Sequence, residues 1–210
     1  MAVRPYEFNS RLGHSFFFLP SSSMVETSRK AVFLDRDGTL NRDTSYLIRF
    51  EDFELIPGVE AALLLLQELG YRLFVVTNQS GVARRYFSLE AMESLHRSIT
   101  EFFAAKGIRL EEIVACPHHV EGADPRFTMD CECRKPKPGM IKYLEHKYQL
   151  DLAASFTVGD KLSDAQAGLN AGTTGVLIRA ATGLNWLPIP ENIREFHSLL
   201  DFAQSLSEIR

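Results

Sequence analysis

Asp35 and Asp37 are two acids separated by one residue, and they directly follow an apolar run at residues 31–34. The run is short and apolar throughout, which predicts a strand buried on both faces. Side chains at positions i and i+2 of an extended chain point the same way, so both carboxylates can face one site. Gly38 then allows the chain to turn. Alone, the pattern also fits an acidic turn after a strand, so support must come from elsewhere in the chain.

Polar side chains follow three other apolar runs in the same way. Thr77 and Asn78 follow the run at 73–76, Arg134 and Lys135 come after the run at 113–115, and Asp160 and Asp164 follow the run at 155–158. In open parallel sheets, ligands bind beyond the carboxyl ends of the strands. We therefore expect four strand-end loops to form a single site.

The chemistry of these groups points to phosphoryl transfer. Carboxylates that share a site repel one another unless a cation offsets their charge, and hard oxygen ligands without histidine favour Mg²⁺. An aspartate can attack a phosphate dianion only with such a cation and Lys135 nearby, which fits a covalent aspartyl-phosphate. We expect Asp35, at the strand end, to be the nucleophile and Asp37 to be the acid and base. Thr77 and nearby backbone N–H groups would donate to the transferring oxygens.

The three cysteines of the chain, Cys116, Cys131 and Cys133, lie close together, and His118 follows the first with C-x-H spacing. Three sulfur ligands and one nitrogen ligand suit a closed tetrahedral zinc site, which would fold the loop and take no part in catalysis. A disulfide is the alternative, but it would leave an odd thiol. His119 could replace His118, although we expect His119 to face solvent.

Strand and helix signals alternate along the chain, which predicts one α/β domain with a mainly parallel sheet. The expected strands lie at residues 31–34, 73–76, 113–115, 155–158 and 175–178, and the expected helices start near 57, 88 and 138, end at 172, and span 199–209. We assign residues 29–210 to this domain, with a loop inserted at 116–133. Residues 1–28 are expected to be an N-terminal extension.

The composition limits the partners. The 210 residues are 45% hydrophobic and 24% charged, with a formal net charge of -4, which gives no general attraction to nucleic acid or to anionic membranes. No apolar stretch approaches the roughly 18 residues of a spanning helix, and the short run at residues 16–19 is below the roughly 7 to 15 residues of a signal-peptide core. We expect a cytoplasmic monomer that binds a small molecule.

Four motifs resemble those of the haloacid dehalogenase superfamily of aspartate-nucleophile phosphatases: D-R-D-G-T at 35–39, T-N at 77–78, R-K-P at 134–136 and G-D-K-x-x-D at 159–164. The resemblance runs from about residue 30 to residue 181. Within the superfamily, N-Q-S-G-V-A-R at 78–84, C-P-H-H at 116–119 and C-E-C-R-K-P-K-P-G-M at 131–140 resemble the D-glycero-D-manno-heptose 1,7-bisphosphate 7-phosphatases. The related histidinol-phosphate phosphatases share the superfamily motifs and often the cysteine loop.

The resemblance implies a Rossmann-like fold with helices on both faces of the sheet, and a Mg²⁺-dependent phosphatase that removes the 7-phosphate of the heptose bisphosphate. It implies that Mg²⁺ is held by Asp35, the Asp37 backbone carbonyl and Asp160, with Asp164 a further candidate beside them. The substrate contacts that it implies are Asp43, Thr44, Ser45, Tyr46, Thr77, Asn78, Gln79, Ser80, Arg134, Lys135 and Lys161. A phosphatase for histidinol phosphate or another small phosphomonoester is the alternative, followed by an inactive zinc-stabilised binding domain.

Several basic residues have weaker claims. Lys137 could rival Lys135 as the phosphate lysine, but the motif position favours Lys135. Arg84 and Arg85 could meet a remote phosphate or could simply be solvated. His96 and His146 fall within helical patterns and are expected at the surface.

Overall fold

Six parallel strands form the centre of the protein, in the order β3-β2-β1-β4-β5-β6. The computed structural model describes residues 28–179 and 189–208, so the predicted N-terminal extension lies almost wholly outside the described residues. The strands are β1 (Ala31–Leu34), β2 (Arg72–Asn78), β3 (Leu110–Cys116), β4 (Phe156–Gly159), β5 (Thr174–Ile178) and β6 (Ile193–Phe196). The predicted α/β fold and its five strands are confirmed, and β6 is an additional edge strand.

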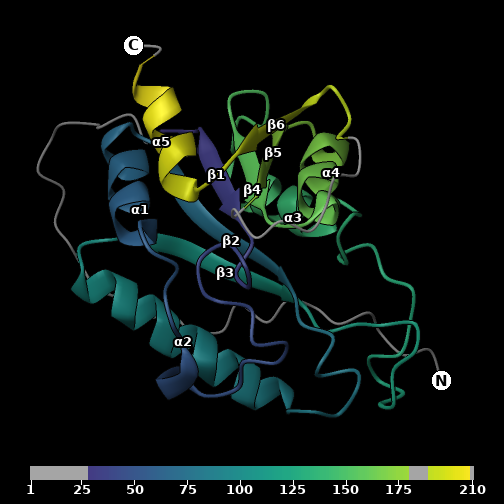
Figure 1. Ribbon diagram of the computed structural model, residues 1–210. Coiled ribbons are helices and arrows are strands. Elements are labelled where there is room, and N and C mark those ends of the chain that lie inside the picture. The colour runs from purple at the N-terminus through teal and green to yellow at the C-terminus, as the bar shows by residue number, and fades with distance from the viewer. Residues whose placement is uncertain (1–27, 180–188, 209–210) are drawn as a thin grey trace, which may run out of the picture.

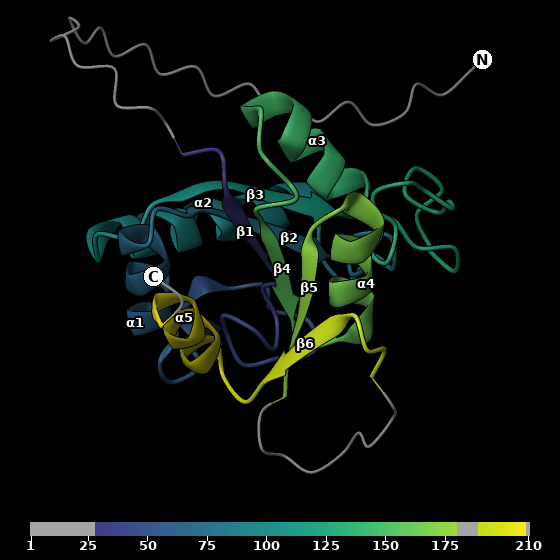
Figure 2. The same cartoon turned by 90° about the horizontal axis from the view of Figure 1, so that it is seen from above.

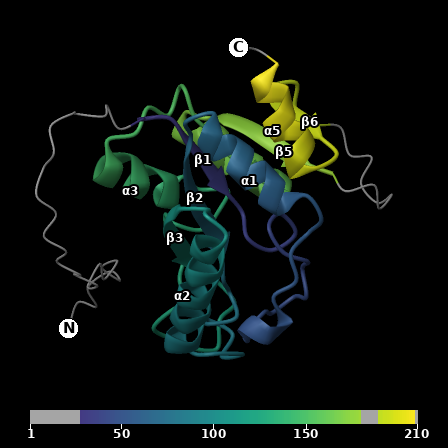
Figure 3. The same cartoon turned by 90° about the vertical axis from the view of Figure 1, so that its left-hand side faces the viewer.

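Helices cover both faces of the sheet, as predicted (Figure 2). The α-helices are α1 (Val59–Glu68), α2 (Leu89–Ala105), α3 (Gly139–Tyr148), α4 (Leu162–Ala171) and α5 (Leu199–Ser207), and a short 3-10 helix, η1, spans Phe50–Asp52. Helices α1, α2 and α5 pack on one face, and α1 and α5 lie side by side (Figure 3). Helices α3 and α4 cover the other face. Among the described residues, none of these helices has both the length and the apolarity that a bilayer-spanning segment needs.

Strand β1 is buried on both sides, because its residues alternate between two hydrophobic cores. Val32 and Leu34 pack in the core under α1, α2 and α5, whereas Ala31 and Phe33 pack in the core under α3 and α4. All four side chains are 0% exposed, which explains why the sequence shows a continuous apolar run rather than an alternating one. The burial fixes the end of β1, and therefore the position of the residues that follow it.

The site lies between β1 and β4, where the order in which strands are added to the sheet reverses. β1 pairs with β2 on one side and with β4 on the other, so the loops that leave β1 and β4 diverge (Figure 1). The backbone N–H of Asp35 donates to the Val158 carbonyl at 2.8 Å and joins the two strand ends. Such a switch point in a parallel sheet leaves a crevice beyond the carboxyl ends of the strands. The predicted acids are therefore delivered to one place.

Candidate active site

A cavity of about 550 Å³ opens at the carboxyl ends of β1, β2 and β4. Its walls come from all four loops that the sequence singled out: Asp35, Asp37, Asp43, Ser45, Tyr46, Thr77, Asn78, Gln79, Ser80, Gly81, Arg134, Lys135, Lys161, Ser163 and Asp164. Of the predicted contacts, Thr44 does not line this cavity but an adjacent hollow. Ser163 and Gly81 line it without having been predicted. The structure therefore brings together almost the whole predicted set.

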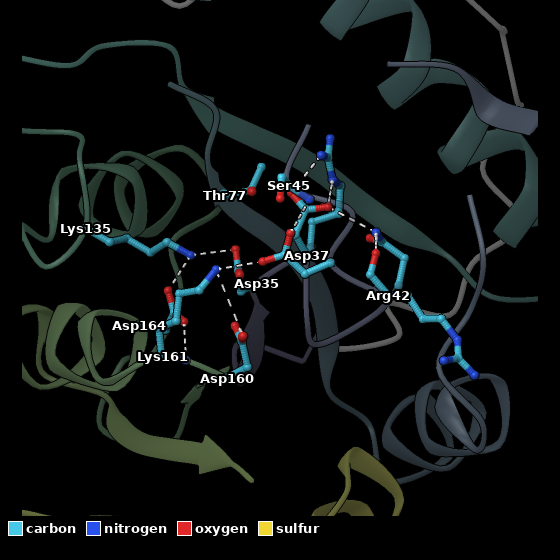
Figure 4. A network of polar contacts seen from close by, with 12 residues as sticks. Asp35, Asp37, Arg42, Ser45, Thr77, Lys135, Asp160, Lys161 and Asp164 are labelled. Atoms are coloured by element: carbon cyan, nitrogen blue, oxygen red, sulfur yellow. Dashed lines mark hydrogen bonds and ion pairs between the residues drawn. The ribbon is translucent and has the colours of Figure 1, made fainter. Parts of the chain in front are cut away.

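Lys135 is buried at the base of the cavity and contacts two acids. Its Nζ lies 2.7 Å from Asp35 Oδ1 and 2.7 Å from Asp164 Oδ1 (Figure 4), and it also donates to the Val76 carbonyl at 2.7 Å. Burial works against its charge, but the carboxylates of Asp35 and Asp164 outweigh burial and raise the pKa of Lys135. The lysine is therefore a fixed cation beside the proposed nucleophile.

Asn78 holds the backbone of Lys135 in place. The Asn78 side chain accepts from the Lys135 N–H at 3.1 Å and donates to the Lys135 carbonyl at 3.2 Å. This pair of hydrogen bonds joins the end of β2 to the loop after the cysteine cluster. The rival residue, Lys137, is directed instead to Asp130 and Glu132 at the surface, at 2.7 and 3.3 Å. The geometry thus favours Lys135 as the lysine of the site.

Three carboxylates lie close together beside Lys135, which contacts two of them. Oxygens of Asp35, Asp160 and Asp164 lie within 4.8 Å of one another. The pKa of Asp35 is raised to about 6 and that of Asp160 to about 7. Burial is the main cause, neighbouring acids add to it, and a nearby lysine partly offsets it in each case. Asp160 Oδ1 is buried and has no hydrogen-bond partner among the described residues. A buried oxygen without a partner, within a cluster of three acids, suits a hard divalent cation.

Gly38 allows Asp160 to approach the end of β1. Its φ of +84° is left-handed, and a Cβ at this position would lie only 2.3 Å from Asp160 Oδ2. Any side chain here would both strain the turn and displace the acid. The glycine of the D-R-D-G-T motif therefore serves the carboxylate cluster as well as the turn.

Asp37 is held by donors on both of its oxygens. Arg36 Nε and Asn41 Nδ2 donate to Oδ1 at 3.1 and 3.0 Å, and Arg36 Nη2 and Gln79 Nε2 donate to Oδ2 at 2.7 and 3.0 Å. Burial alone would raise the pKa of Asp37, but the charge and hydrogen bonds of Arg36 outweigh it and lower the pKa. The Gln79 amide also donates to the Thr77 hydroxyl at 2.9 Å and so links Asp37 to the end of β2.

His96 corrects one prediction, because it is buried and not at the surface. It is 8% exposed, and its Nε2 lies 2.9 Å from Arg36 Nη1. The sequence contained a signal, since His96 lies four residues after Met92 and three before Ile99 on the apolar stripe of α2. His146, by contrast, is exposed as predicted. Arg36, which the sequence analysis did not single out, is 1% exposed.

The mouth of the cavity is formed partly by the loop after β1. Lys161 Nζ donates to Asp43 Oδ2 at 3.1 Å, so this loop reaches across to the start of α4. The Tyr46 ring packs edge-on against Tyr86 with centroids 4.6 Å apart, and both rings are exposed. These contacts place polar and aromatic groups around the entrance of the cavity.

The predicted zinc ligands also lie together. Cys116 Sγ lies 3.7 Å from His118 Nδ1 and 3.5 Å from Cys131 Sγ, and Cys133 Sγ lies 3.3 Å from both His118 Nδ1 and Cys131 Sγ. All three cysteines are free thiols. Tetrahedral zinc with Zn–S bonds of about 2.3 Å would place sulfurs about 3.7 Å apart. The cluster therefore has the composition and nearly the size of a structural zinc site, and the disulfide alternative is not what the structure shows.

The cysteine loop is connected to the cavity through Arg134, whose Nη1 donates to the His118 carbonyl at 3.2 Å. His119 is half-buried rather than solvent-facing, with its ring nitrogen 3.2 Å from Arg84 Nη2. Arg85 pairs with Asp124 at 3.9 Å. Neither Arg84 nor Arg85 lines the cavity, so the structure gives neither a place beside the reacting groups.

Known proteins share both the sequence and the fold. A family model of HAD-like hydrolases matches residues 132–184. The D-glycero-beta-D-manno-heptose-1,7-bisphosphate 7-phosphatase of Photorhabdus laumondii is 42% identical over 86% of this chain and 96% of its own length. A D-glycero-alpha-D-manno-heptose-1,7-bisphosphate 7-phosphatase of the same organism is 41% identical over 71% of this chain and 81% of its own length.

A solved structure agrees with these relatives. The D,D-heptose 1,7-bisphosphate phosphatase from B. bronchiseptica, complexed with magnesium and phosphate, superimposes with a TM-score of 0.75 at 32% identity, covering 86% of this chain and 99% of that one. Proteins that share only a fold often have much lower sequence identity than the 42% found over nearly the whole length of the Photorhabdus relative. The chain belongs to the haloacid dehalogenase superfamily of phosphatases, in the family of the heptose 1,7-bisphosphate 7-phosphatases.

Proposed function

We propose that this enzyme removes the 7-phosphate of D-glycero-D-manno-heptose 1,7-bisphosphate through a phosphate ester of Asp35. The observation that carries the reaction is the buried Asp35 carboxylate, which lies 2.7 Å from Lys135 in the same cavity as Asp37. The substrate is supported by the names of the full-length relatives. The chain carries a residue for each role in the proposed reaction: a nucleophile, a proton donor, a cation and a hydroxyl donor.

In the first step, an Asp35 oxygen attacks phosphorus as the bond from phosphorus to the sugar oxygen breaks. The electron pair of that bond goes to the sugar oxygen, which takes a proton from the Asp37 carboxyl. Arg36 favours the ionised form of Asp37, but a phosphate dianion in the cavity repels that form and raises its pKa. Lys135 and the Thr77 hydroxyl offset the charge on the transferring group.

In the second step, water attacks the phosphorus of the aspartyl-phosphate and gives its proton to the Asp37 carboxylate. The bond between phosphorus and the Asp35 oxygen breaks, and its electron pair restores the Asp35 carboxylate. Inorganic phosphate leaves, and Asp37 is again protonated for the next cycle. One carboxyl group therefore acts first as an acid and then as a base.

Asp35, Asp160 and the Asp37 backbone carbonyl are the groups that we propose would hold Mg²⁺, with Asp164 beside them. The unpartnered Asp160 oxygen and the raised pKa values of Asp35 and Asp160 support this assignment. When bound, the cation would neutralise these carboxylates and polarise the phosphoryl oxygens. Because Asp164 Oδ1 contacts Lys135 and Asp164 Oδ2 accepts from the Lys161 N–H, Asp164 is better suited to orient this loop than to bind the ion directly.

Zinc is proposed as the ion of the cluster formed by Cys116, His118, Cys131 and Cys133. All four positions of a tetrahedral ion would be filled by protein, so the role is to fold the loop that carries Arg134. The expectations of a monomer and of a cytoplasmic location rest on the sequence alone and stay predictions.

Phosphate release measured side by side on candidate substrates tests the proposed substrate. We expect kcat/KM to be highest for heptose 1,7-bisphosphate, with the alpha and beta anomers assayed separately because the relatives carry both names. A higher kcat/KM for histidinol phosphate would replace the proposed substrate with the alternative. Absence of hydrolysis of every phosphorylated small molecule in the presence of Mg²⁺ would contradict the proposed activity itself.

A further inference from the structure

The feature that the mechanism leaves unused is a buried chain of hydrogen bonds behind Asp37. Arg36 is 1% exposed, and its Nε and Nη2 donate to the two oxygens of Asp37 at 3.1 and 2.7 Å. A two-pronged contact of this kind fixes the position and the plane of a carboxyl group together. The orientation of Asp37 therefore depends on where the Arg36 guanidinium lies.

The position of Arg36 depends in turn on His96. Arg36 Nη1 lies 2.9 Å from His96 Nε2, and since a guanidinium can only donate, Nε2 must be the acceptor. Burial, and after it the charge of Arg36, lower the pKa of His96 to about 3, so the ring is neutral and Nε2 is free to accept. His96 of α2, which lies sixty residues after Arg36, thus binds the third nitrogen of its guanidinium.

We propose that His96 is a positioning residue for the proton transfer, acting through Arg36 to hold the Asp37 carboxyl toward the leaving oxygen. Asp37 lies on the turn after β1 and not within the strand, so side-chain contacts must orient it. Without His96, Nη1 would be buried with no acceptor at this position, and the guanidinium would turn to find one. The inference rests on the proposed role of Asp37 as the proton donor.

The leaving group separates this role from a purely structural one. A sugar oxygen leaves poorly unless it is protonated, whereas p-nitrophenolate leaves readily without a proton. The parameter kcat/KM covers the steps up to the first irreversible one, which is departure of the leaving group. A misplaced Asp37 should therefore lower kcat/KM for the sugar phosphate much more than for p-nitrophenyl phosphate, whereas general destabilisation should lower both equally.

The experiment compares His96→Leu with His96→Gln on heptose 1,7-bisphosphate and on p-nitrophenyl phosphate. For His96→Leu we expect a loss of about tenfold or more on the sugar phosphate and less than about twofold on the aryl phosphate. His96→Gln offers an amide oxygen to Nη1 and should recover most of the activity. Ile99→Val, on the buried stripe of the same helix, is the matched control and should show no such discrimination. Equal losses on both substrates, or no loss on either, would overturn the proposal.

Two further variants keep the outcome decisive. If His96→Leu does not accumulate as folded protein, His96→Asn takes its place, because its shorter amide should not reach Nη1 and should show the same selective loss. Asp37→Asn is the reference, and an equal loss on both substrates in that variant would refute the proposed proton donor and the His96 proposal together. A selective loss in Asp37→Asn without one in the His96 variants would refute His96 alone. If the wild-type enzyme acts on another alkyl phosphate, that compound replaces the heptose.

Discussion

Replacing Asp160 with asparagine should stabilise the metal-free enzyme while removing its activity. The Asp160 carboxylate is largely buried, its Oδ1 has no hydrogen-bond partner among the described residues, and Lys161 Nζ is 4.0 Å from Oδ2. Little stabilising contact is therefore lost on substitution. The substitution removes the unfavourable free energy of an ionised carboxylate held beside Asp35 and Asp164. Such local destabilisation is common where function requires it.

The pKa of Asp160 sets the size and the sign of this effect. Burial and neighbouring acids raise it from 3.8 to about 7, so between these values the folded state binds more protons than the unfolded state. The contribution of Asp160 to the stability of the metal-free protein therefore falls as pH rises from about 4 to about 7. At about 1.4 kcal/mol per pKa unit, and after a discount for partial exposure, the cost at pH 8 is on the order of 3 kcal/mol.

Urea unfolding at pH 8 and pH 4 measures the effect in Mg²⁺-free buffer without a chelator. Each variant is compared with the wild type at the same pH, so that a change at the cysteine cluster in acid affects both proteins alike. Asp160→Asn should exceed the wild-type stability by roughly 2 to 4 kcal/mol at pH 8, and by less than about 1 kcal/mol at pH 4. Asp201→Asn, an exposed acid on α5, is the control and should change stability by no more than about 0.5 kcal/mol. A less stable Asp160→Asn variant at pH 8, or a difference that does not vary with pH, would show that the ionised Asp160 carboxylate does not destabilise the fold.

Two other changes test the ion pairs of Lys135 and the cysteine cluster. Lys135→Met leaves Asp35 and Asp164 without the cation that they share. Urea unfolding should show a loss of stability of about 3 to 5 kcal/mol. A loss below about 1 kcal/mol would contradict the proposed role of the lysine in offsetting those charges. Purified wild-type protein should contain one equivalent of tightly bound zinc by elemental analysis, and Cys131→Ser should lose it together with thermal stability, whereas unchanged metal content in the variant would contradict the assignment.

The fold was predictable wherever a strand is buried on both faces, because such strands appear as continuous apolar runs. β1 and β2 carry that signal, whereas β6, with Arg194 and Glu195 in its centre, lies at the edge of the sheet and gives none. The candidate site was predictable for a related reason, because the carboxyl ends of parallel strands lie along the same side of the sheet. Residues that follow those strands are brought together whatever their separation in the chain.

Contacts made by side chains from distant helices were not predictable in this way. His96 shares the apolar face of α2, but only the packing of α2 against the sheet shows that its ring meets Arg36. Arg36 itself lies between the two acids, and its position in the sequence does not show that its side chain turns back to Asp37. Thr44, in the loop after β1, was expected at the substrate and points instead to an adjacent hollow, because an irregular loop has no periodicity from which to deduce direction.

Asp35 should carry a phosphate during turnover, and chemical trapping can detect it. The enzyme is mixed with heptose 1,7-bisphosphate and Mg²⁺, quenched during a single turnover, and treated with borohydride, which reduces an aspartyl-phosphate to homoserine. Peptide mass spectrometry should find homoserine at position 35 in the wild type and not in Asp35→Asn, which should be folded and inactive. Modification at Asp37 instead, or appreciable turnover by Asp35→Asn, would show that Asp35 is not the nucleophile.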